Sequence, residues 1–227
     1  MIPLKDDNPT KSFPFVTIIL IAVNAGVFFY QLSLGDVRGK VFVFTYGAIP
    51  YELMNSINLP LTPYIPNSVT VFTSMFLHGG LFHLGGNMLY LWIFGNNIED
   101  SMGHIKFIVF YLMCGIAAVF AHSLVNPGSK LPMIGASGAI AGVLGAYILL
   151  FPRARVLTLI PLGFFIRIIE IPALIVIGFW IVIQFLSGAM SAGAAGGGIA
   201  YFAHIGGFLS GFALIGLFKK RGVKFFK

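Results

Sequence analysis

Residues 135–145 read Gly-Ala-Ser-Gly-Ala-Ile-Ala-Gly-Val-Leu-Gly, a run of small and apolar side chains with a single hydroxyl group. Ser137, Ala141 and Gly145 recur at intervals of four, so on a helix they form one stripe, which two further glycines widen. Stripes of small residues let the backbones of two membrane helices approach closely. This stretch therefore predicts a helix that packs tightly against a partner helix, with Ser137 in its first turn.

A second stretch has a matching pattern. Residues 203–211 read Ala-His-Ile-Gly-Gly-Phe-Leu-Ser-Gly, in which His204, Gly207 and Gly211 recur at i, i+3 and i+7. Each stripe thus begins with a polar residue that is capable of catalysis. If the two stripes face each other, Ser137 and His204 meet near one end of the contact between the helices.

The composition places this contact in a membrane. Charged residues make up 9% of the 227 residues and hydrophobic residues 58%, whereas a soluble domain carries about a quarter charged residues. So few charges cannot cover a water-facing surface, which excludes a soluble globular enzyme, a disordered chain and a nucleic-acid binder of ordinary type. The single cysteine, Cys114, excludes an intramolecular disulfide and a cysteine metal cluster, and it is interpreted as a packing residue.

Long stretches without Asp, Glu, Lys or Arg locate the membrane segments, because a spanning helix needs about 20 mostly apolar residues. We predict an all-α, multi-pass membrane protein with six transmembrane helices, folded as a single domain over residues 1–227. The predicted spans lie at about residues 13–30, 71–94, 105–123, 137–151, 172–186 and 199–218.

Two segments between these spans are not expected to cross. Residues 156–166 are uncharged but too few to span, and they contain Pro161 and Gly163, so we expect an interfacial or re-entrant loop. A crossing there would make the number of spans odd. Residues 187–198 consist of Gly, Ala and Ser with one Met, which predicts a flexible break in the chain.

The distribution of positive charge orients the spans. An even number puts both termini on one side, and eleven of the fourteen Lys and Arg residues then lie on that side, against Arg38, Lys40 and Lys130 on the other. Because Lys and Arg favour the cytoplasmic side, we expect both termini to be cytoplasmic. The net charge of +7 and the basic tail therefore indicate topology and contact with anionic lipid, and no nucleic-acid partner is expected.

This orientation puts four polar side chains at a similar shallow depth below the outer surface: His83 and Asn87 in the second span, Ser137 in the fourth and His204 in the sixth. Polar groups there are costly unless they face the protein interior or a water-filled cavity. His83 and Asn87 are four residues apart and share a helix face. His78, five residues before His83, is rotated away from that face and is interpreted as a tie between the first loop and the second span.

These residue types suit acyl transfer. A serine is a weak nucleophile without an adjacent base, and His204 is the residue expected to take the Ser137 proton. None of the seven Asp and Glu residues lies within a membrane span near Ser137 or His204. We therefore expect a Ser-His dyad without an acidic third member. The first-turn N–H of Ser137, the Asn87 amide and the His83 ring are available as hydrogen-bond donors to an oxyanion.

At these residues the sequence resembles the rhomboid family of intramembrane serine proteases. Three pieces carry the resemblance, and they occur in the family's order and in the second, fourth and sixth spans. They are His78-Gly-Gly-Leu-Phe-His83-Leu-Gly-Gly-Asn87, Gly135-Ala-Ser137-Gly138 and Ala203-His204-Ile-Gly-Gly207-Phe-Leu-Ser-Gly211.

The resemblance implies a minimal six-helix core in which Ser137 is the nucleophile and His204 is its general base. It implies that His83 and Asn87 help to hold the oxyanion. It also implies that residues 34–70 form the family's first loop, and that the fifth span, with Phe179 and Trp180, is the side from which a substrate helix approaches.

The expected function is hydrolysis of peptide bonds in or near the transmembrane helices of membrane-protein substrates, with no cofactor and no metal ion. The site is expected to open to the extracytoplasmic side of a prokaryotic plasma membrane, since no targeting peptide is apparent. One alternative is a non-enzymatic protein that binds membrane helices, as inactive rhomboid relatives are thought to do. A metal or proton transporter using His78, His83 and His204 is disfavoured, because no Asp, Glu or Lys within the spans supports a relay.

Overall fold

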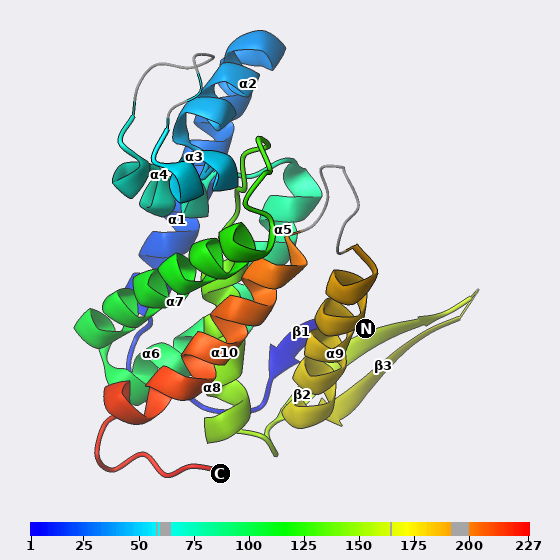
Figure 1. Cartoon of the computed structure of the whole chain (residues 1–227). Coiled ribbons are helices and arrows are strands. Elements are labelled where there is room, and N and C mark those ends of the chain that lie inside the picture. Colours follow the sequence, from blue (N-terminus) through cyan, green and yellow to red (C-terminus); the bar gives the residue numbers. More distant parts are fainter. Residues whose placement is uncertain (58, 60–64, 164, 192–199) are drawn as a thin grey trace.

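A computed structural model describes residues 1–57, 59, 65–163, 165–191 and 200–227 as a bundle of helices with a small sheet on one side (Figure 1). The N-terminal part comprises β1 (Ile2–Asp6), α1 (Phe15–Ser33), α2 (Gly35–Tyr46), α3 (Pro50–Asn55), α4 (Asn67–Thr73) and the 3-10 turn η1 (Ser74–Phe76). The middle part comprises α5 (Leu81–Tyr90), the π-helical turn η2 (Leu91–Gly95), α6 (Asn96–Met102), α7 (His104–Val125) and α8 (Ser137–Leu150). The chain ends with β2 (Arg155–Leu162), β3 (Phe165–Pro172), α9 (Ala173–Ser191) and α10 (Tyr201–Phe218).

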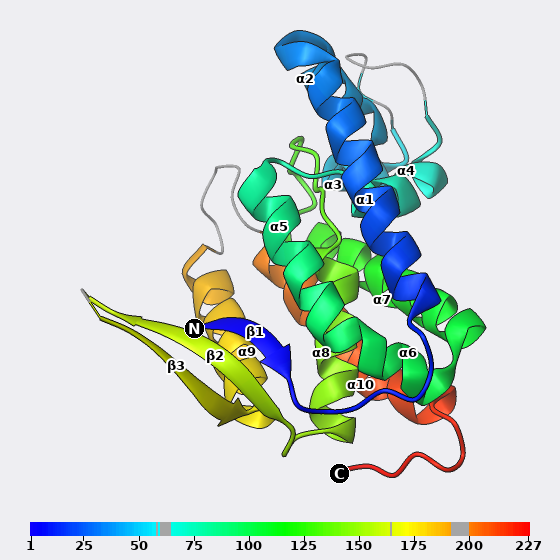
Figure 2. The same ribbon diagram turned by 180° about the vertical axis from the view of Figure 1, so that it is seen from behind.

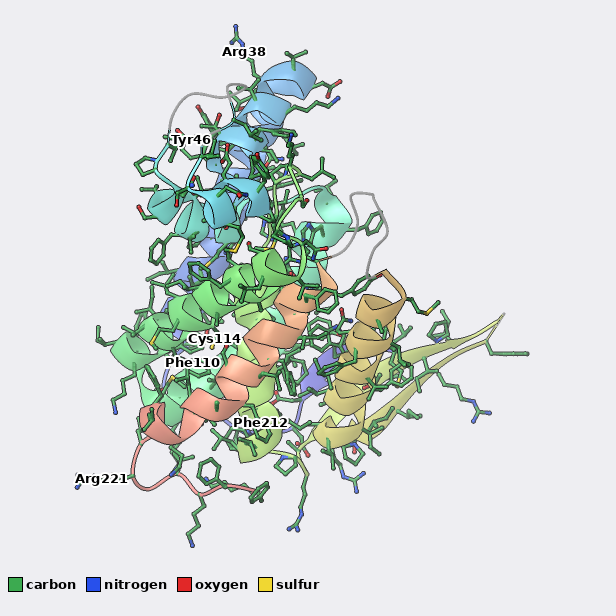
Figure 3. All side chains as sticks on the ribbon, viewed as in Figure 1. Arg38, Tyr46, Phe110, Cys114, Phe212 and Arg221 are labelled. Atoms are coloured by element: carbon green, nitrogen blue, oxygen red, sulfur yellow. The ribbon has the colours of Figure 1, made fainter. Side chains whose placement is uncertain are left out.

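Four of the described helices are long and apolar enough to cross a membrane, namely α1, α7, α9 and α10. Each overlaps a predicted span. Helix α8 has only 14 residues. The predicted second span, residues 71–94, overlaps the end of α4, η1, α5 and most of η2, and α5, η2 and α6 follow one another without a break. Arg38 and Arg221, which we place on different sides of the membrane, lie at opposite ends of the molecule (Figure 3). The number of six crossings and the cytoplasmic termini stay predictions.

Helix α8 is the most deeply buried helix of the bundle and packs against α7, α10 and η2. Every residue from Gly138 to Tyr147 is buried. Small residues on several sides of the helix let the neighbouring helices pack closely around it, which suits a central position. Ser137, at the first position of α8, is thereby held at the end of the central helix.

The glycines of α8 and α10 face each other. A methyl group at Gly207 would overlap the carbonyl oxygen of Gly138, and one at Gly211 would overlap that of Gly142. Gly145 likewise lies against the backbone of Phe208. The contact predicted from the two small-residue stripes is confirmed, and the two backbones touch without intervening side chains.

The far end of α8 is held by both ends of the chain. The Tyr147 hydroxyl donates a hydrogen bond of 2.6 Å to Asp6 Oδ2, just at the end of β1. The backbone N–H groups of Phe226 and Lys227 donate to the carbonyl oxygens of Leu149 and Leu150, each at 2.9 Å. These last carbonyls of a helix have no partner within the helix, so the C-terminal tail acts as its cap.

The prediction of an all-α fold is wrong at residues 155–172. Where we expected an interfacial or re-entrant loop at 156–166, β2 and β3 form an antiparallel hairpin that pairs Arg155 with Pro172 and Leu162 with Phe165. The reason is local composition: both strands are rich in the β-branched residues Val, Ile and Thr, and these residues favour strands. The length criterion showed that the segment does not span as a helix, but it carried no information on strand pairing.

The N-terminal residues complete this sheet, whose strand order is β1-β2-β3. Strand β1 pairs antiparallel with β2, with Ile2 opposite Leu159 and Asp6 opposite Val156. The hairpin projects away from the bundle beside α9 (Figures 1 and 2). The sheet thus joins the N-terminus to the connection between α8 and α9.

The predicted second span, residues 71–94, is wrong in its first part. Helix α4 and η1 end before Leu77, whose backbone is extended, and a new helix begins only at Leu81. Gly79 and Gly80 stand at this break, and glycine disfavours a continuous helix. His78 therefore lies in a buried loop before α5 instead of within a helix.

Two predicted loops are described only in part. In the predicted break at 187–198, residues 187–191 continue α9, and 192–198 lie outside the described residues. In the first loop, 34–70, the described residues form α2, α3 and the start of α4, while 58 and 60–64 lie outside them.

Glu99 of α6 anchors the start of α1. Its carboxylate accepts hydrogen bonds from the backbone N–H groups of Val16 (2.9 Å) and Thr17 (2.8 Å) and from the Thr17 hydroxyl (2.7 Å). His104 Nδ1 lies 2.6 Å from the same carboxylate, which is fully buried. A negative charge at unpaired first-turn N–H groups is a favourable helix cap.

We predict that Glu99→Gln destabilises the protein by about 3 kcal/mol, because it removes a buried charge that three donors and a histidine surround. Thermal unfolding in detergent measures the change. Glu170→Gln is the matched control, since the Glu170 side chain is mostly exposed and its nearest Arg155 nitrogen is 4.0 Å away. Equal unfolding temperatures for the two variants would contradict this assignment.

We predict that Gly207→Ala separates α8 from α10 and destabilises the protein by about 2 to 3 kcal/mol, because the added methyl group meets a backbone carbonyl that cannot move aside. Gly178→Ala in α9 is the control, since no atom lies within 4 Å of the added group. Thermal unfolding again gives the measurement. A Gly207→Ala protein as stable as Gly178→Ala would show that the contact is looser than described.

Candidate active site

Ser137 and His204 meet at one end of the glycine contact. Ser137 Oγ lies 2.8 Å from His204 Nε2, within hydrogen-bond distance. Ser137 opens α8, and His204 lies in the first turn of α10, so the close approach of the two helices brings these side chains together. This is the arrangement that the spacing of the two stripes predicted.

The second ring nitrogen of His204 has a partner that the sequence analysis missed. His204 Nδ1 lies 2.7 Å from Oε1 of Gln184 in α9. The ring of Trp180, one turn earlier on α9, lies against the imidazole with the ring centroids 5.6 Å apart. The signal was present in the sequence, because a lone amide within an apolar membrane span indicates a polar partner inside the protein.

Among the described residues, no carboxylate hydrogen-bonds to His204. That catalysis uses a serine and a histidine without an acidic third member stays a prediction. A neutral amide stands where a serine protease triad has its carboxylate. His204 and Gln184 are both buried, at 9% and 7% exposed, so this chain of hydrogen bonds is shielded from solvent.

His83 and Asn87 lie on one face of α5, beside the turn that leads into α8. A Cβ atom at Gly135 would be 2.8 Å from His83 Nε2 and 3.7 Å from Asn87 Nδ2, so only glycine leaves room for these groups. Gly135 also has φ of +123°, which side chains disfavour. His83 and Asn87, the two candidate oxyanion donors, therefore lie next to Gly135, two positions before Ser137.

The hydrogen bonds of His83 indicate which of its nitrogens carries the proton. The backbone N–H of Gly79 donates to His83 Nδ1 at 3.3 Å. A neutral imidazole has one donor and one acceptor nitrogen, so Nε2 is the N–H donor. This nitrogen is the one that faces Gly135.

His78 lies closer to the site than its spacing predicted. Its Nε2 atom is 2.9 Å from Asn87 Nδ2, and its ring centroid is 5.0 Å from that of His83. The prediction that it is rotated away is wrong because His78 is not on the helix, so helical spacing does not apply. Its carbonyl oxygen also accepts a hydrogen bond from Gln31 Nε2 of α1, so this bond joins His78 to the first span and not to the first loop as predicted.

A small hollow adjoins Ser137 on the side of α7. Its lining includes Ser137, Gly138, Ala118 and Met75. The lining residues are all small or apolar. With a volume of about 20 Å³, the hollow has room for about one water molecule or a methyl group.

The comparisons with known proteins agree on one family. The Rhomboid domain profile matches residues 66–221. The chain is 31% identical over 154 residues to the mitochondrial Rhomboid protein 1 of Saccharomyces cerevisiae, covering 65% of this chain and 41% of the relative. It is 29% identical over 167 residues to RHOMBOID-like protein 1 of Arabidopsis thaliana, covering 74% and 39%.

A bacterial relative is similar over nearly the same extent. The chain is 35% identical over 142 residues to the Rhomboid protease GluP of Bacillus subtilis, covering 63% of this chain and 24% of the relative. The aligned part thus spans less than half of the length of each of these three relatives. The matched domain includes the His78–Asn87 loop and helix, the Ser137 turn and the His204 helix, and this chain belongs to the rhomboid family.

Proposed function

We propose that this protein is an intramembrane serine endopeptidase that hydrolyses peptide bonds in or near the transmembrane helices of membrane proteins. The observation that carries the proposal is the 2.8 Å approach of Ser137 Oγ to His204 Nε2 at the end of the α8–α10 contact. The similarity to a relative named as a rhomboid protease supports the same activity.

In the proposed reaction, His204 Nε2 takes the Ser137 hydroxyl proton while Oγ bonds to the scissile carbonyl carbon. The proton then passes from Nε2 to the leaving amine nitrogen as the C–N bond breaks, which leaves an acyl-enzyme. A water molecule then bonds to the acyl carbon as His204 Nε2 takes its proton. The ester bond from that carbon to Ser137 Oγ breaks, the proton on Nε2 goes to Oγ, and the new carboxyl end is released. No acidic side chain is required at any of these steps.

In each step the carbonyl oxygen of the substrate becomes an oxyanion, and preorganised hydrogen-bond donors are needed to stabilise it. We assign this role to His83 Nε2, to the Asn87 amide and to the backbone N–H of Ser137, which is unpaired because it begins a helix. The Asn87 NH₂ group carries two hydrogens. One is directed at His78 Nε2, so His78 orients the amide while the other hydrogen stays available.

Substrates are expected to be membrane-spanning segments that unwind easily. An intact helix keeps its carbonyl groups in hydrogen bonds, so glycine, proline or polar residues near the cleavage site favour attack. The hollow beside Ser137 favours a small side chain next to the scissile bond. We propose approach past α9, because Phe179 and Val182 of this helix are exposed and suited to lipid or to an apolar segment.

The proposed topology has both termini in the cytoplasm and the site open to the extracytoplasmic side. It is supported by the excess of Lys and Arg on the side of the termini. A prokaryotic plasma membrane is the proposed location. Water for deacylation would then reach the site from outside, and cleavage would fall near the outer end of the substrate helix.

We predict that Ser137→Ala lowers cleavage of a single-span substrate in liposomes by at least about 1000-fold, because the nucleophile is lost. A serine-directed phosphonate should label the wild-type protein at Ser137 and leave the variant unlabelled. Ser33→Ala is the matched control, since Ser33 bonds only to the carbonyl of Tyr30 at the end of α1.

Full cleavage by a folded Ser137→Ala protein would refute the proposal. Binding of the substrate helix by wild-type protein without any cleavage would instead favour a non-enzymatic helix-binding function.

We predict that Asn87→Ala lowers kcat by about 100- to 1000-fold and changes KM by much less, because the amide acts on charge that develops only in the transition state. Steady-state cleavage kinetics in liposomes measure both constants. Asn55→Ala is the control, since this exposed amide, among the described residues, donates to the Tyr51 carbonyl in α3 and lies far along the chain from Asn87. A loss confined to KM would remove Asn87 from the oxyanion site and assign it to substrate binding.

A further inference from the structure

Gln184 is the residue through which α9 reaches the Ser137–His204 pair. It lies in the same helix as Val182 and Phe185, whose side chains are largely exposed, yet its own side chain is buried. Its Oε1 atom lies 2.7 Å from His204 Nδ1. The inference drawn from this contact rests on the proposed protease function.

The orientation of the Gln184 amide follows from its two neighbours. Its Nε2 atom donates to the carbonyl oxygen of Trp180 at 3.4 Å, one turn back along α9. Turning the amide over would set two oxygen atoms against each other at that contact. Oε1 therefore faces His204, and because it is an acceptor only, His204 Nδ1 must carry a proton.

This assignment determines the state of the reactive nitrogen. A neutral imidazole has one protonated nitrogen, so a proton on Nδ1 leaves a lone pair on Nε2. Nε2 is the atom that faces the Ser137 hydroxyl at 2.8 Å. The other tautomer would present an N–H to Ser137, and that N–H could not take the serine proton.

The surroundings strengthen this hydrogen bond. The Trp180 ring packs against the imidazole of His204, with an angle of 37° between the ring planes. This contact limits rotation of the imidazole. A hydrogen bond shielded from water is electrostatically stronger than an exposed one. The imidazole is thus held from two positions on one helix, α9, while Ser137 is held by α8.

We propose that Gln184 is a positioning residue, the neutral acceptor that sets the tautomer and the orientation of His204. When Ser137 Oγ bonds to the substrate carbonyl, its proton moves to Nε2, and the Nδ1 proton stays in its hydrogen bond to Gln184. When the C–N bond breaks, the proton on Nε2 goes to the amine. Gln184 neither gains nor loses a proton in either step.

The kinetic test compares Gln184→Met, which keeps the side-chain length but removes the acceptor, with Gln184→Glu, which keeps an acceptor oxygen. Loss of one hydrogen bond to a developing imidazolium should lower kcat of Gln184→Met by about 10- to 100-fold, with KM within about threefold of wild type. Gln184→Glu should recover most of this loss. Ile175→Met, at an exposed position near the start of α9, is the matched control and should retain wild-type kinetics.

A second measurement does not depend on activity. Nitrogen NMR of ¹⁵N-histidine protein, at a pH where the rings are neutral, distinguishes protonated from bare ring nitrogens. The chain has five histidines, so the signals of His204 are assigned as those that disappear from the spectrum of His204→Asn. We expect a protonated Nδ1 and a bare Nε2 in the wild type, and a mixture of tautomers in Gln184→Met.

The two measurements separate this inference from the proposed function. If Ser137→Ala stays active, the protease proposal fails, while the tautomer result still reports whether Gln184 orients His204. The positioning role is refuted by a protonated Nε2 in the wild-type spectrum. It is also refuted if Gln184→Met, with folding intact, cleaves as fast as Ile175→Met.

Discussion

The close contact between α8 and α10 governs the geometry of the whole candidate site. Gly207 and Gly211 lie directly against the carbonyl groups of Gly138 and Gly142, so no side chain separates the two helices. In lipid, apolar side chains give little driving force for the association of helices, so close packing of the backbones provides the main attraction. Because the two helices lie this close, the short side chain of Ser137 comes within hydrogen-bond distance of the His204 ring.

The two members of the pair are supported from different parts of the molecule. Ser137 belongs to the central helix, whose far end is held by Asp6 of the N-terminal strand and by the C-terminal tail. His204 is oriented by Gln184 and Trp180 of α9, which lies at the edge of the bundle beside the sheet (Figure 1). The central helix thus carries Ser137, while a helix at the edge of the bundle contacts His204. Any displacement of α9 relative to α10 would first change the position of the His204 imidazole.

The candidate oxyanion donors depend on a break in the chain before α5. His78 occupies the buried loop that replaces the expected continuous helix, and its ring contacts the Asn87 amide. Gly79 in the same loop donates to His83, which leaves the other nitrogen of that ring directed at Gly135. One short loop therefore orients both side chains. The two candidate side-chain donors, His83 and Asn87, and the residues that contact them, His78 and Gly79, lie within ten positions of each other in the sequence.

Local patterns in the sequence were enough to establish the membrane class, the four longest apolar helices and the pairing of Ser137 with His204. Hydropathy and the spacing of small residues act within one helix, so they can be read without knowing the fold. The sheet is different, since it pairs Ile2–Asp6 with residues more than 140 positions later. The approach of Gln184 to His204 and of His78 to Asn87 likewise joins separate segments, one through the packing of α9 and the other through a non-helical loop. Periodicity describes which residues share a face of one element, but contacts between elements are set by how the whole chain packs.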